Sequence, residues 1–132
     1  MGNHRTIFQA VGALLLAAMP SLAHHSFMAE YDETRLITLS GTVTKVSWKN
    51  PHVTMNLDVK DESGKVTNWE LELASPNGLL SQGWKVDSLK QGVRVAVTGF
   101  GARNGSHLAN ARKVVIGGTA YPALRDENRS RK

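Results

Sequence analysis

The sequence predicts an all-β domain of five antiparallel strands with one short helix between the third and fourth strands. Two observations support this fold class. Apolar and polar residues alternate along several short segments, as they do in strands with one face buried and one face wet. Between these segments lie clusters of Gly, Asn, Asp and Pro that favour turns. A single segment around Ser75–Gly83 interrupts the alternation with helix signals.

The first strand is expected from Ile37 onward, and its apolar phase changes along its length. Leu39, Gly41 and Val43 alternate with polar residues. Val46 and Trp48 then alternate in the opposite phase. One extra residue in a strand moves every later side chain to the other face, so this pattern predicts a β-bulge and a bent strand.

The second and third strands are expected to form a hairpin. Val53 to Val59 alternates strictly with polar residues, and the apolar residues Trp69, Leu71 and Leu73 do the same farther along. The intervening run 61–65, Asp-Glu-Ser-Gly-Lys, has the composition of a hairpin turn.

A helix of about two turns is expected after the third strand. Ser75 is suited to the N-cap, Pro76 to the first helical position, and Gly83 to the position beyond the end. Such a short helix is expected to plug one end of a sheet.

Two more strands are expected in the second half of the chain. Val93 to Val97 alternates with polar residues and is followed by Gly99. Asn104-Gly105 favours a further hairpin before a last strand from Ala109 to Ile116. With a bent first strand, this order predicts an OB-fold-like five-stranded antiparallel Greek-key barrel. A half-open five-stranded sandwich would produce the same pattern and remains an alternative.

The first 23 residues have the features of a secretory signal peptide. Arg5 precedes an apolar run from Ile7 to Met19, and Ala23 closes a run of small residues. Cleavage is predicted after Ala23, so the mature chain would begin at His24 in the periplasm or outside the cell. The apolar run is shorter than the roughly 20 residues of a membrane-spanning helix, and no membrane span is predicted. We expect an N-terminal arm over 24–36, the barrel over 37–117 and a polar, disordered tail over 118–132.

Composition limits the possible functions. The 132 residues include no cysteine, which excludes disulfides and thiolate ligands. The formal net charge is +5, and several of the basic residues lie after Tyr121. We interpret this charge as favouring solubility, because an exported protein rarely meets nucleic acid and no aromatic residues are interleaved with a basic stripe. Nucleic acid is therefore not expected as a partner.

A metal site is predicted from the histidines near the cleavage site. If the mature chain begins at His24, its α-amine and its imidazole can chelate one metal ion together. His25 and His52 are the candidates for further nitrogen ligands. A set of nitrogen ligands favours copper, with zinc as the other candidate. The alternative is that His24 and His25 are unordered polar residues and that His52 caps a turn.

A second candidate surface is the polar face of the second and third strands. Glu70 and Glu72 lie on one face of the third strand by alternation, and Asn50 lies near the edge of the second. The carboxylates could support His52 as hydrogen-bond partners or oxygen ligands, or form a wet face that binds an envelope protein, peptide or small ligand without metal. Trp48 and Trp69 fall in the apolar phase and are expected in the core.

Catalysis is not predicted. The sequence has no glycine-rich phosphate loop, no serine in a nucleophile elbow and no His-Glu-x-x-His motif. An enzyme that uses Glu70 and Glu72 as acid and base is the least favoured hypothesis.

Several short motifs together resemble a known protein family. They are Ala23-His24-His25-Ser26-Phe27, Glu30-Tyr31-Asp32, Gly41-Thr42-Val43, Asn50-Pro51-His52, Thr67-Asn68-Trp69 and Ser75-Pro76-Asn77-Gly78-Leu79-Leu80. Across about His24 to Ile116 the chain resembles a family of small exported bacterial proteins known as domain of unknown function 6152. The resemblance implies a periplasmic single-domain protein and supplies no activity. The polar tail after Gly118 is not part of the resemblance.

Overall fold

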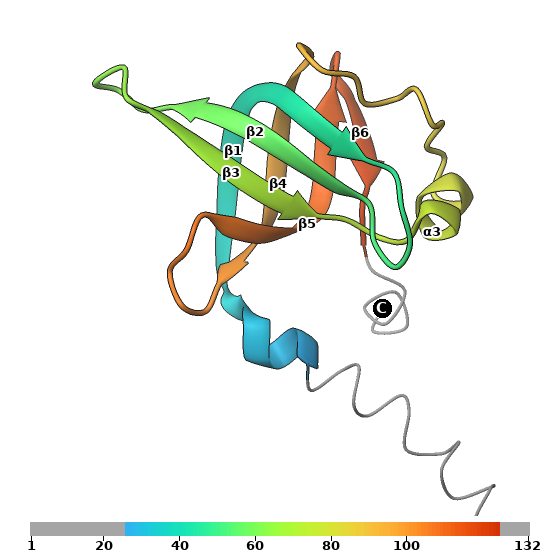
Figure 1. The fold of residues 1–132 in the computed structure, drawn as a ribbon, viewed down its shortest axis with the longest axis horizontal. Helices are drawn as coiled ribbons and strands as arrows, with labels where there is room; N and C mark the ends of the chain where they lie inside the picture. The colour runs from blue at the N-terminus through green and yellow to red at the C-terminus, as the bar shows by residue number, and fades with distance from the viewer. Residues whose placement is uncertain (1–25, 125–132) are drawn as a thin grey trace, which may run out of the picture.

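The computed structural model describes residues 26–124. A short helical segment at 26–30 precedes the first strand. The elements that follow are β1 (Tyr31–Ser47), β2 (Thr54–Lys60), β3 (Val66–Glu72), α3 (Pro76–Ser81), β4 (Arg94–Ala102), β5 (Leu108–Ile116) and β6 (Thr119–Pro122). The strands form a mostly antiparallel sheet in the order β3-β2-β1-β4-β5-β6 (Figure 1). A parallel pairing of β3 with β5 closes this sheet into an OB-like barrel.

The long first strand bends where its apolar phase changes. Gly41 pairs with Val59 of β2 on one side and with Val95 of β4 on the other, so β1 serves both halves of the barrel. The register between β1 and β2 shifts between Val43 and Lys45. The predicted bulge is therefore confirmed at the position where the apolar phase changes.

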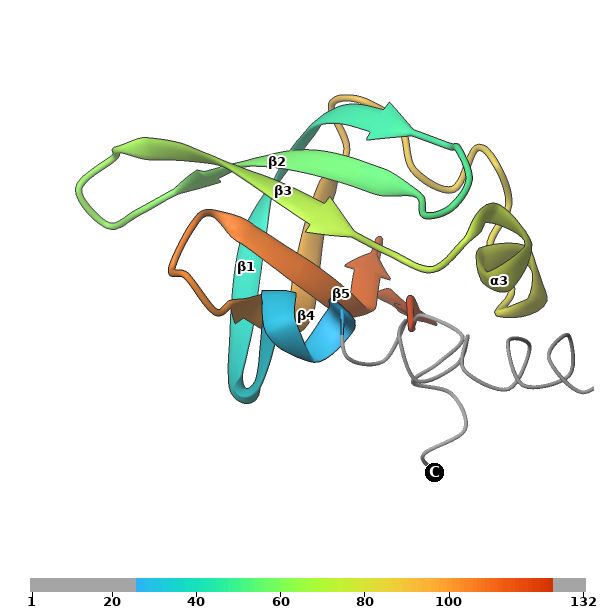
Figure 2. The same cartoon turned by 60° about the horizontal axis from the view of Figure 1, so that its bottom comes forward.

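The β2–β3 hairpin extends beyond the body of the barrel (Figure 2). Its turn is held by Asp61, whose Oδ1 accepts hydrogen bonds from the Ser63 hydroxyl at 2.7 Å and the Lys65 backbone N–H at 2.9 Å. Gly64 supplies the positive φ of 88° that the turn requires. These hydrogen bonds lower the pKa of the Asp61 carboxyl, with the bond from the Ser63 hydroxyl as the largest cause.

The core lies inside the barrel and is closed at one end by α3. Its inward-facing residues include Met55 and Leu57 of β2, Leu71 of β3 and Val97 of β4, all buried. Leu79 of α3 is buried in the same cluster. Trp84 belongs to it as well, while Trp48 and Trp69 pack against its edge. Trp48 and Trp69, which were predicted to lie in the core, are therefore only partly buried and border it.

The helix α3 begins as the sequence predicts. The Ser75 hydroxyl accepts a hydrogen bond from the Gly78 backbone N–H at 3.0 Å, and Pro76 is the first helical residue. Gly83, just after the helix, has a φ of 92°. The N-cap, the proline and the glycine thus stand in the order expected for a short helix.

Two boundaries differ from the sequence-based prediction. The first strand begins at Tyr31 instead of Ile37, so residues 31–36 of the predicted arm belong to β1. Residues 119–122 of the predicted tail form β6, which pairs with β5, and the following Ala123 and Leu124 are buried. The Trp84 indole N–H donates to the Pro122 carbonyl at 2.6 Å, which fastens this last strand to the segment after α3.

Candidate functional site

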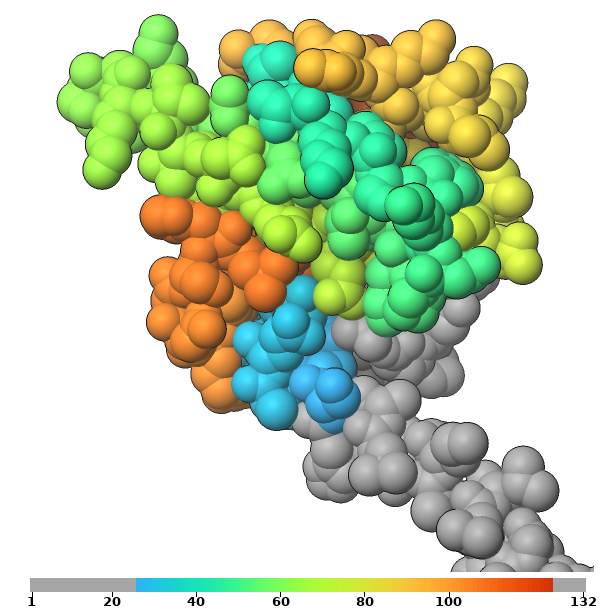
Figure 3. All heavy atoms as spheres, viewed as in Figure 1, coloured from blue at the N-terminus to red at the C-terminus, as the bar shows by residue number. Residues whose placement is uncertain are grey.

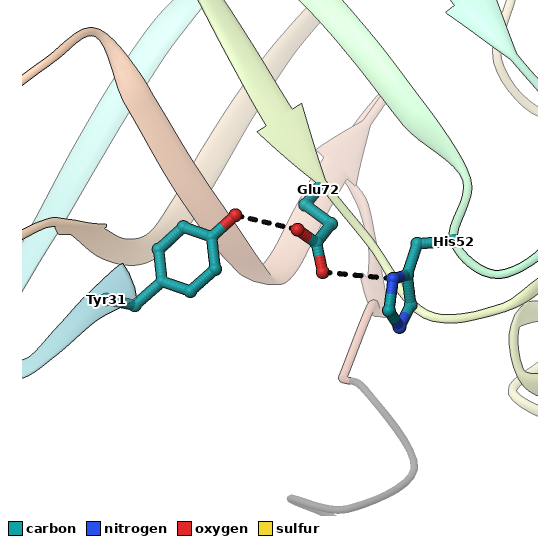
Figure 4. A network of polar contacts seen from close by, with 3 residues as sticks. All are labelled: Tyr31, His52 and Glu72. Carbon is teal, nitrogen blue, oxygen red and sulfur yellow. Dashed lines mark hydrogen bonds and ion pairs between the residues drawn. The ribbon is translucent and has the colours of Figure 1, made fainter. Parts of the chain in front are cut away.

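Three polar side chains meet at the end of β3. The Tyr31 hydroxyl donates a hydrogen bond to Glu72 Oε2 at 2.8 Å, and His52 Nδ1 lies 3.2 Å from Glu72 Oε1 (Figure 4). The side chains of His52 and Glu72 are 24% and 15% exposed. One carboxylate thus links three separate parts of the chain: the start of β1, the β1–β2 connection and β3.

Backbone hydrogen bonds fix His52 beside Glu72. The neighbouring residue Val53 donates to the Ala74 carbonyl at 3.0 Å and accepts from the Leu73 N–H at 2.8 Å. These bonds hold the end of the β1–β2 connection against the residues that follow β3. His52 therefore faces Glu72 from a rigid backbone.

The chain before β1 is anchored at the same place. Phe27 and Tyr31 are fully buried, and their ring centroids are 5.3 Å apart. We call residues 26–31 the N-terminal segment. It packs beside the β4–β5 connection, as Figure 3 shows for the blue and orange surfaces. The sequence motif around Phe27 and Tyr31 thus forms a fixed attachment to the barrel.

Arg103 of the β4–β5 connection holds the N-terminal segment with three hydrogen bonds. Its side chain donates to the Met28 carbonyl at 3.0 Å and to the Tyr31 carbonyl at 3.1 Å. Its backbone N–H donates to the Glu30 carbonyl at 2.8 Å. Arginine suits this role because its guanidinium presents several donors in a fixed plane.

Asp32 places a negative charge beside this attachment. Its Oδ1 accepts from the Thr34 hydroxyl at 2.7 Å and from the Thr34 backbone N–H at 3.0 Å. These two bonds, followed in size by attraction to Arg103 and Arg35, lower the pKa of the Asp32 carboxyl. Asp32 therefore stays ionised over a wider acidic range than an isolated aspartate.

The sequence-predicted site residues have different positions. His24 and His25 lie outside the described residues. Asn50 and Glu70 are exposed, whereas Glu72 is turned into the contact with Tyr31 and His52. The register of β2 and β3 places Glu70 and Glu72 on one face, as expected, yet only Glu72 joins the site.

Within residues 26–124, no group of three His, Asp or Glu side chains could hold a metal ion. Sequence reasoning missed the polar role of Tyr31 and the anchoring role of Arg103. A tyrosine flanked by Glu30 and Asp32 was the available signal, because a buried phenol normally requires a hydrogen-bond partner.

A second polar surface lies on the outward face of β1, β2 and β3. Asn56 Nδ2 donates to Asn68 Oδ1 at 3.0 Å, and Asn68 Nδ2 donates to Asp58 Oδ1 at 2.8 Å. Asn68 Nδ2 also lies 3.3 Å from the Thr44 hydroxyl. We call Asn56, Asp58 and Asn68 the polar strip. Beside it is a groove of about 340 Å³, lined by Ser40, Gly41, Thr42, Asp58, Lys60, Val66 and Arg94.

Comparison with protein families gives one assignment. The model of a family of unknown function, DUF6152, matches residues 13–111. A search of curated proteins gives no match. No helix within residues 26–124 is long and apolar enough to cross a membrane.

Comparison with solved structures gives proteins of similar fold. The mitochondrial single-stranded DNA binding protein Rim1 of S. cerevisiae is 8% identical, with a TM-score of 0.48, and the match covers 66% of this chain and 95% of that one. The N-terminal domain of PriB from Thermoanaerobacter tencongensis is 21% identical, with a TM-score of 0.44, and the match covers 64% and 97%.

These neighbours correct one prediction. The exclusion of nucleic acid as a partner is wrong, because a protein of similar fold is a single-stranded DNA binding protein. The exclusion rested on predicted export and on the absence of aromatic residues interleaved with a basic stripe. The likeness concerns the fold and assigns no ligand to this chain.

Proposed function

Because the chain belongs to DUF6152, a family of unknown function, we propose its function from its own site: a periplasmic module that binds a divalent copper ion. In this proposal the leader ends at Ala23, and the mature chain begins with His24. The α-amine and imidazole of His24 bind the ion together with His52, and His25 is the further nitrogen ligand. The described residues contribute His52 and the carboxylate behind it.

The contact between His52 and Glu72 carries this proposal. When Nδ1 carries the proton directed at Glu72, the other ring nitrogen keeps its lone pair for a metal ion. That nitrogen faces away from Glu72 (Figure 4). A carboxylate behind the ligating imidazole is a common arrangement in metal sites, because it fixes the tautomer and strengthens the ligand. At 24% exposure, the imidazole can be reached by an ion from solvent.

The anchored N-terminal segment supports the second half of the proposal. Tyr31 bonds the carboxylate that faces His52, so the segment is attached at the site itself. His24 is two residues before Ser26, and two extended residues span about 7 Å. Burial of Phe27 reduces the conformational freedom of the chain on the way to His24.

Copper fits this ligand set better than the other divalent first-row metals. The set holds an amine and imidazoles and, since the sequence has no cysteine, no thiolate. Nitrogen ligands bind copper(II) more tightly than zinc or nickel. Zinc is the competing ion, and the experiment below compares the two.

The test is a metal titration of the natively cleaved protein, with intact mass confirming that it begins at His24. We expect one equivalent of copper(II) to bind, more tightly than zinc. A form with one extra N-terminal glycine is expected to bind at least about tenfold more weakly, because its amine no longer chelates with the His24 imidazole. Equal affinity of the two forms would overturn the terminal-amine mechanism.

Matched histidine variants localise the site. His52→Leu is expected to lose most of the copper affinity. His107→Leu is the control, because His107 is exposed in the β4–β5 connection, where its ring lies 5.0 Å from that of Trp69. An equal loss in both variants would contradict a role for His52.

The polar strip of Asn56, Asp58 and Asn68 supports a second candidate function, in which this face docks an envelope protein or peptide without metal. Hydrogen bonds between these side chains hold the strip ready for a partner. The double variant Asn68→Lys, Glu70→Lys is expected to lose a partner that the wild type captures from envelope extract in the presence of a chelator. Its copper affinity is expected to remain that of the wild type. Retention of the partner would reject this surface.

A further inference from the structure

Asn110 of β5 is a buried polar residue without a hydrogen-bond partner. Its side chain is 0% exposed, and among the residues that the structure describes neither Nδ2 nor Oδ1 has a partner. Buried side-chain polar atoms are bonded in the large majority of cases, to protein or to ordered water. Since an amide offers two donors and an acceptor, Asn110 carries several unused hydrogen-bonding positions.

The strand pattern places Asn110 on the outside of the barrel. Its neighbours Ala109 and Ala111 face the core, so the side chain between them points to the opposite face. A residue on the outer face can be fully buried only if another part of the chain covers it. Tyr31, which follows the helical segment at 26–30, is itself fully buried and reaches this end of the barrel through its hydrogen bond to Glu72 of β3. In Figure 2 the helical segment lies at the front of the molecule, near β4 and β5.

The register places Asn110 next to the candidate site. In the parallel pairing of β3 with β5, Asn110 is the partner of Glu72. Partners in adjacent strands present their side chains on the same face of the sheet, a few ångströms apart. The unused amide of Asn110 therefore lies beside the carboxylate that contacts Tyr31 and His52.

We propose that Asn110 and Glu72 form a buried solvent site under the N-terminal segment, which takes one water molecule. The water donates to the Glu72 carboxylate and exchanges hydrogen bonds with the Asn110 amide. Buried waters occupy sites with two to four polar partners, and the Asn110 amide, the Glu72 carboxylate and the nearby Tyr31 hydroxyl meet that number.

This solvent site makes Asn110 a positioning residue for His52. The water restrains the Glu72 carboxylate from the side opposite His52, and the carboxylate in turn orients the imidazole. This consequence rests on the proposed copper function, whereas the solvent site itself does not. Outer partners of metal ligands affect affinity about 10- to 100-fold.

The first experiment is a high-resolution crystal structure of the metal-free mature protein. We expect an ordered water within about 3.2 Å of both the Asn110 amide and the Glu72 carboxylate. A direct hydrogen bond from the Asn110 amide to protein, or the absence of such a water, would overturn the solvent site.

The second experiment compares copper affinity in Asn110→Leu and Asn56→Leu. Leucine has the branched shape and the number of heavy atoms of asparagine and leaves no unpaired polar atom, so the fold is expected to persist. We expect Asn110→Leu to bind copper about tenfold more weakly, with an altered visible absorption of the bound ion, while Asn56→Leu on the exposed strip binds as the wild type does. Equal affinity of Asn110→Leu and the wild type overturns the positioning role. Failure of the wild type to bind copper instead overturns the proposed function, and the crystal structure still decides the solvent site.

Discussion

The Tyr31 hydroxyl donates a 2.8 Å hydrogen bond to Glu72 and so fastens the start of β1 to the end of β3, although the two residues are 41 positions apart. The β1–β4 and β2–β3 pairings already fix the strands themselves. The bond between these side chains adds a link from the N-terminal segment to the site, and its removal should be measurable in stability.

Tyr31→Phe is expected to lower the free energy of unfolding by about 1–3 kcal/mol, because the shape is kept while a largely buried carboxylate loses a donor. Urea unfolding measures the difference. Tyr121→Phe is the control, since Tyr121 packs against Trp84 and the structure gives its hydroxyl no hydrogen bond within the described residues. Equal losses in both variants would argue against the Glu72 bond.

Arg103→Met is expected to loosen the N-terminal segment, because it removes the side-chain donors to the Met28 and Tyr31 carbonyls while keeping an aliphatic side chain. Amide hydrogen exchange within residues 26–31 should become faster, and the copper affinity of the mature protein should fall. Arg94→Met, a change of equal charge on β4, should affect neither property. Unchanged exchange in Arg103→Met would contradict the anchoring role.

Gly99→Ala is expected to destabilise the barrel by about 1–3 kcal/mol or more, the cost of overpacking a tight site. A Cβ atom at Gly99 would overlap the Asn110 backbone oxygen, so β4 and β5 would have to separate. Thermal unfolding measures this change. Thr98→Ala, one position earlier in β4, is expected to cost about 1 kcal/mol or less. A fully stable Gly99→Ala protein would contradict the close approach of these strands.

The Asp61 turn predicts a small acid-dependent contribution to stability. Its hydrogen bonds lower the folded-state pKa of Asp61 below the unfolded value. This stabilisation is therefore complete above the unfolded pKa, near pH 4, and is lost as the pH falls through the folded pKa. The stability difference between wild type and Asp61→Ala should shrink over that range.

Urea midpoints measured from neutral pH down to about pH 3 test the Asp61 prediction. Glu62→Ala removes an equal charge from the same turn and serves as the control. A difference between wild type and Asp61→Ala that stays constant with pH would rule out the carboxylate as its source.

The sequence predicted most of the fold because local patterns determine it. The bulge in β1 follows from the phase change between Val43 and Val46, and α3 follows from Ser75 and Pro76. The short strand β6 was missed because its residues, Thr119–Pro122, are few and end in proline, so no alternation is visible. Tyr31–Arg35 was missed as a strand because polar residues dominate it.

The candidate site was predictable only in part. Alternation places Glu70 and Glu72 on one face, but only Glu72, at the end of β3, is contacted by Tyr31 and His52, whereas Glu70 is exposed. Asn110 lies between two alanines, a pattern that predicts a wet outer face. Its complete burial requires cover from another part of the protein, and strand periodicity carries no information about such cover.

The β3–β5 pairing has three register pairs and is the shortest among the described strand pairings. Next to it, the Ala74 N–H donates to the Ala123 carbonyl, and the Ala123 N–H donates to the Arg112 carbonyl, so the last described residues bridge the two flanks of this join. Tyr31 of the N-terminal segment bonds Glu72, which belongs to the same pairing. Both ends of the described chain therefore stabilise the β3–β5 pairing that closes the barrel. Proteolytic removal of either Phe27 or Ala123 would weaken closure at this same pairing.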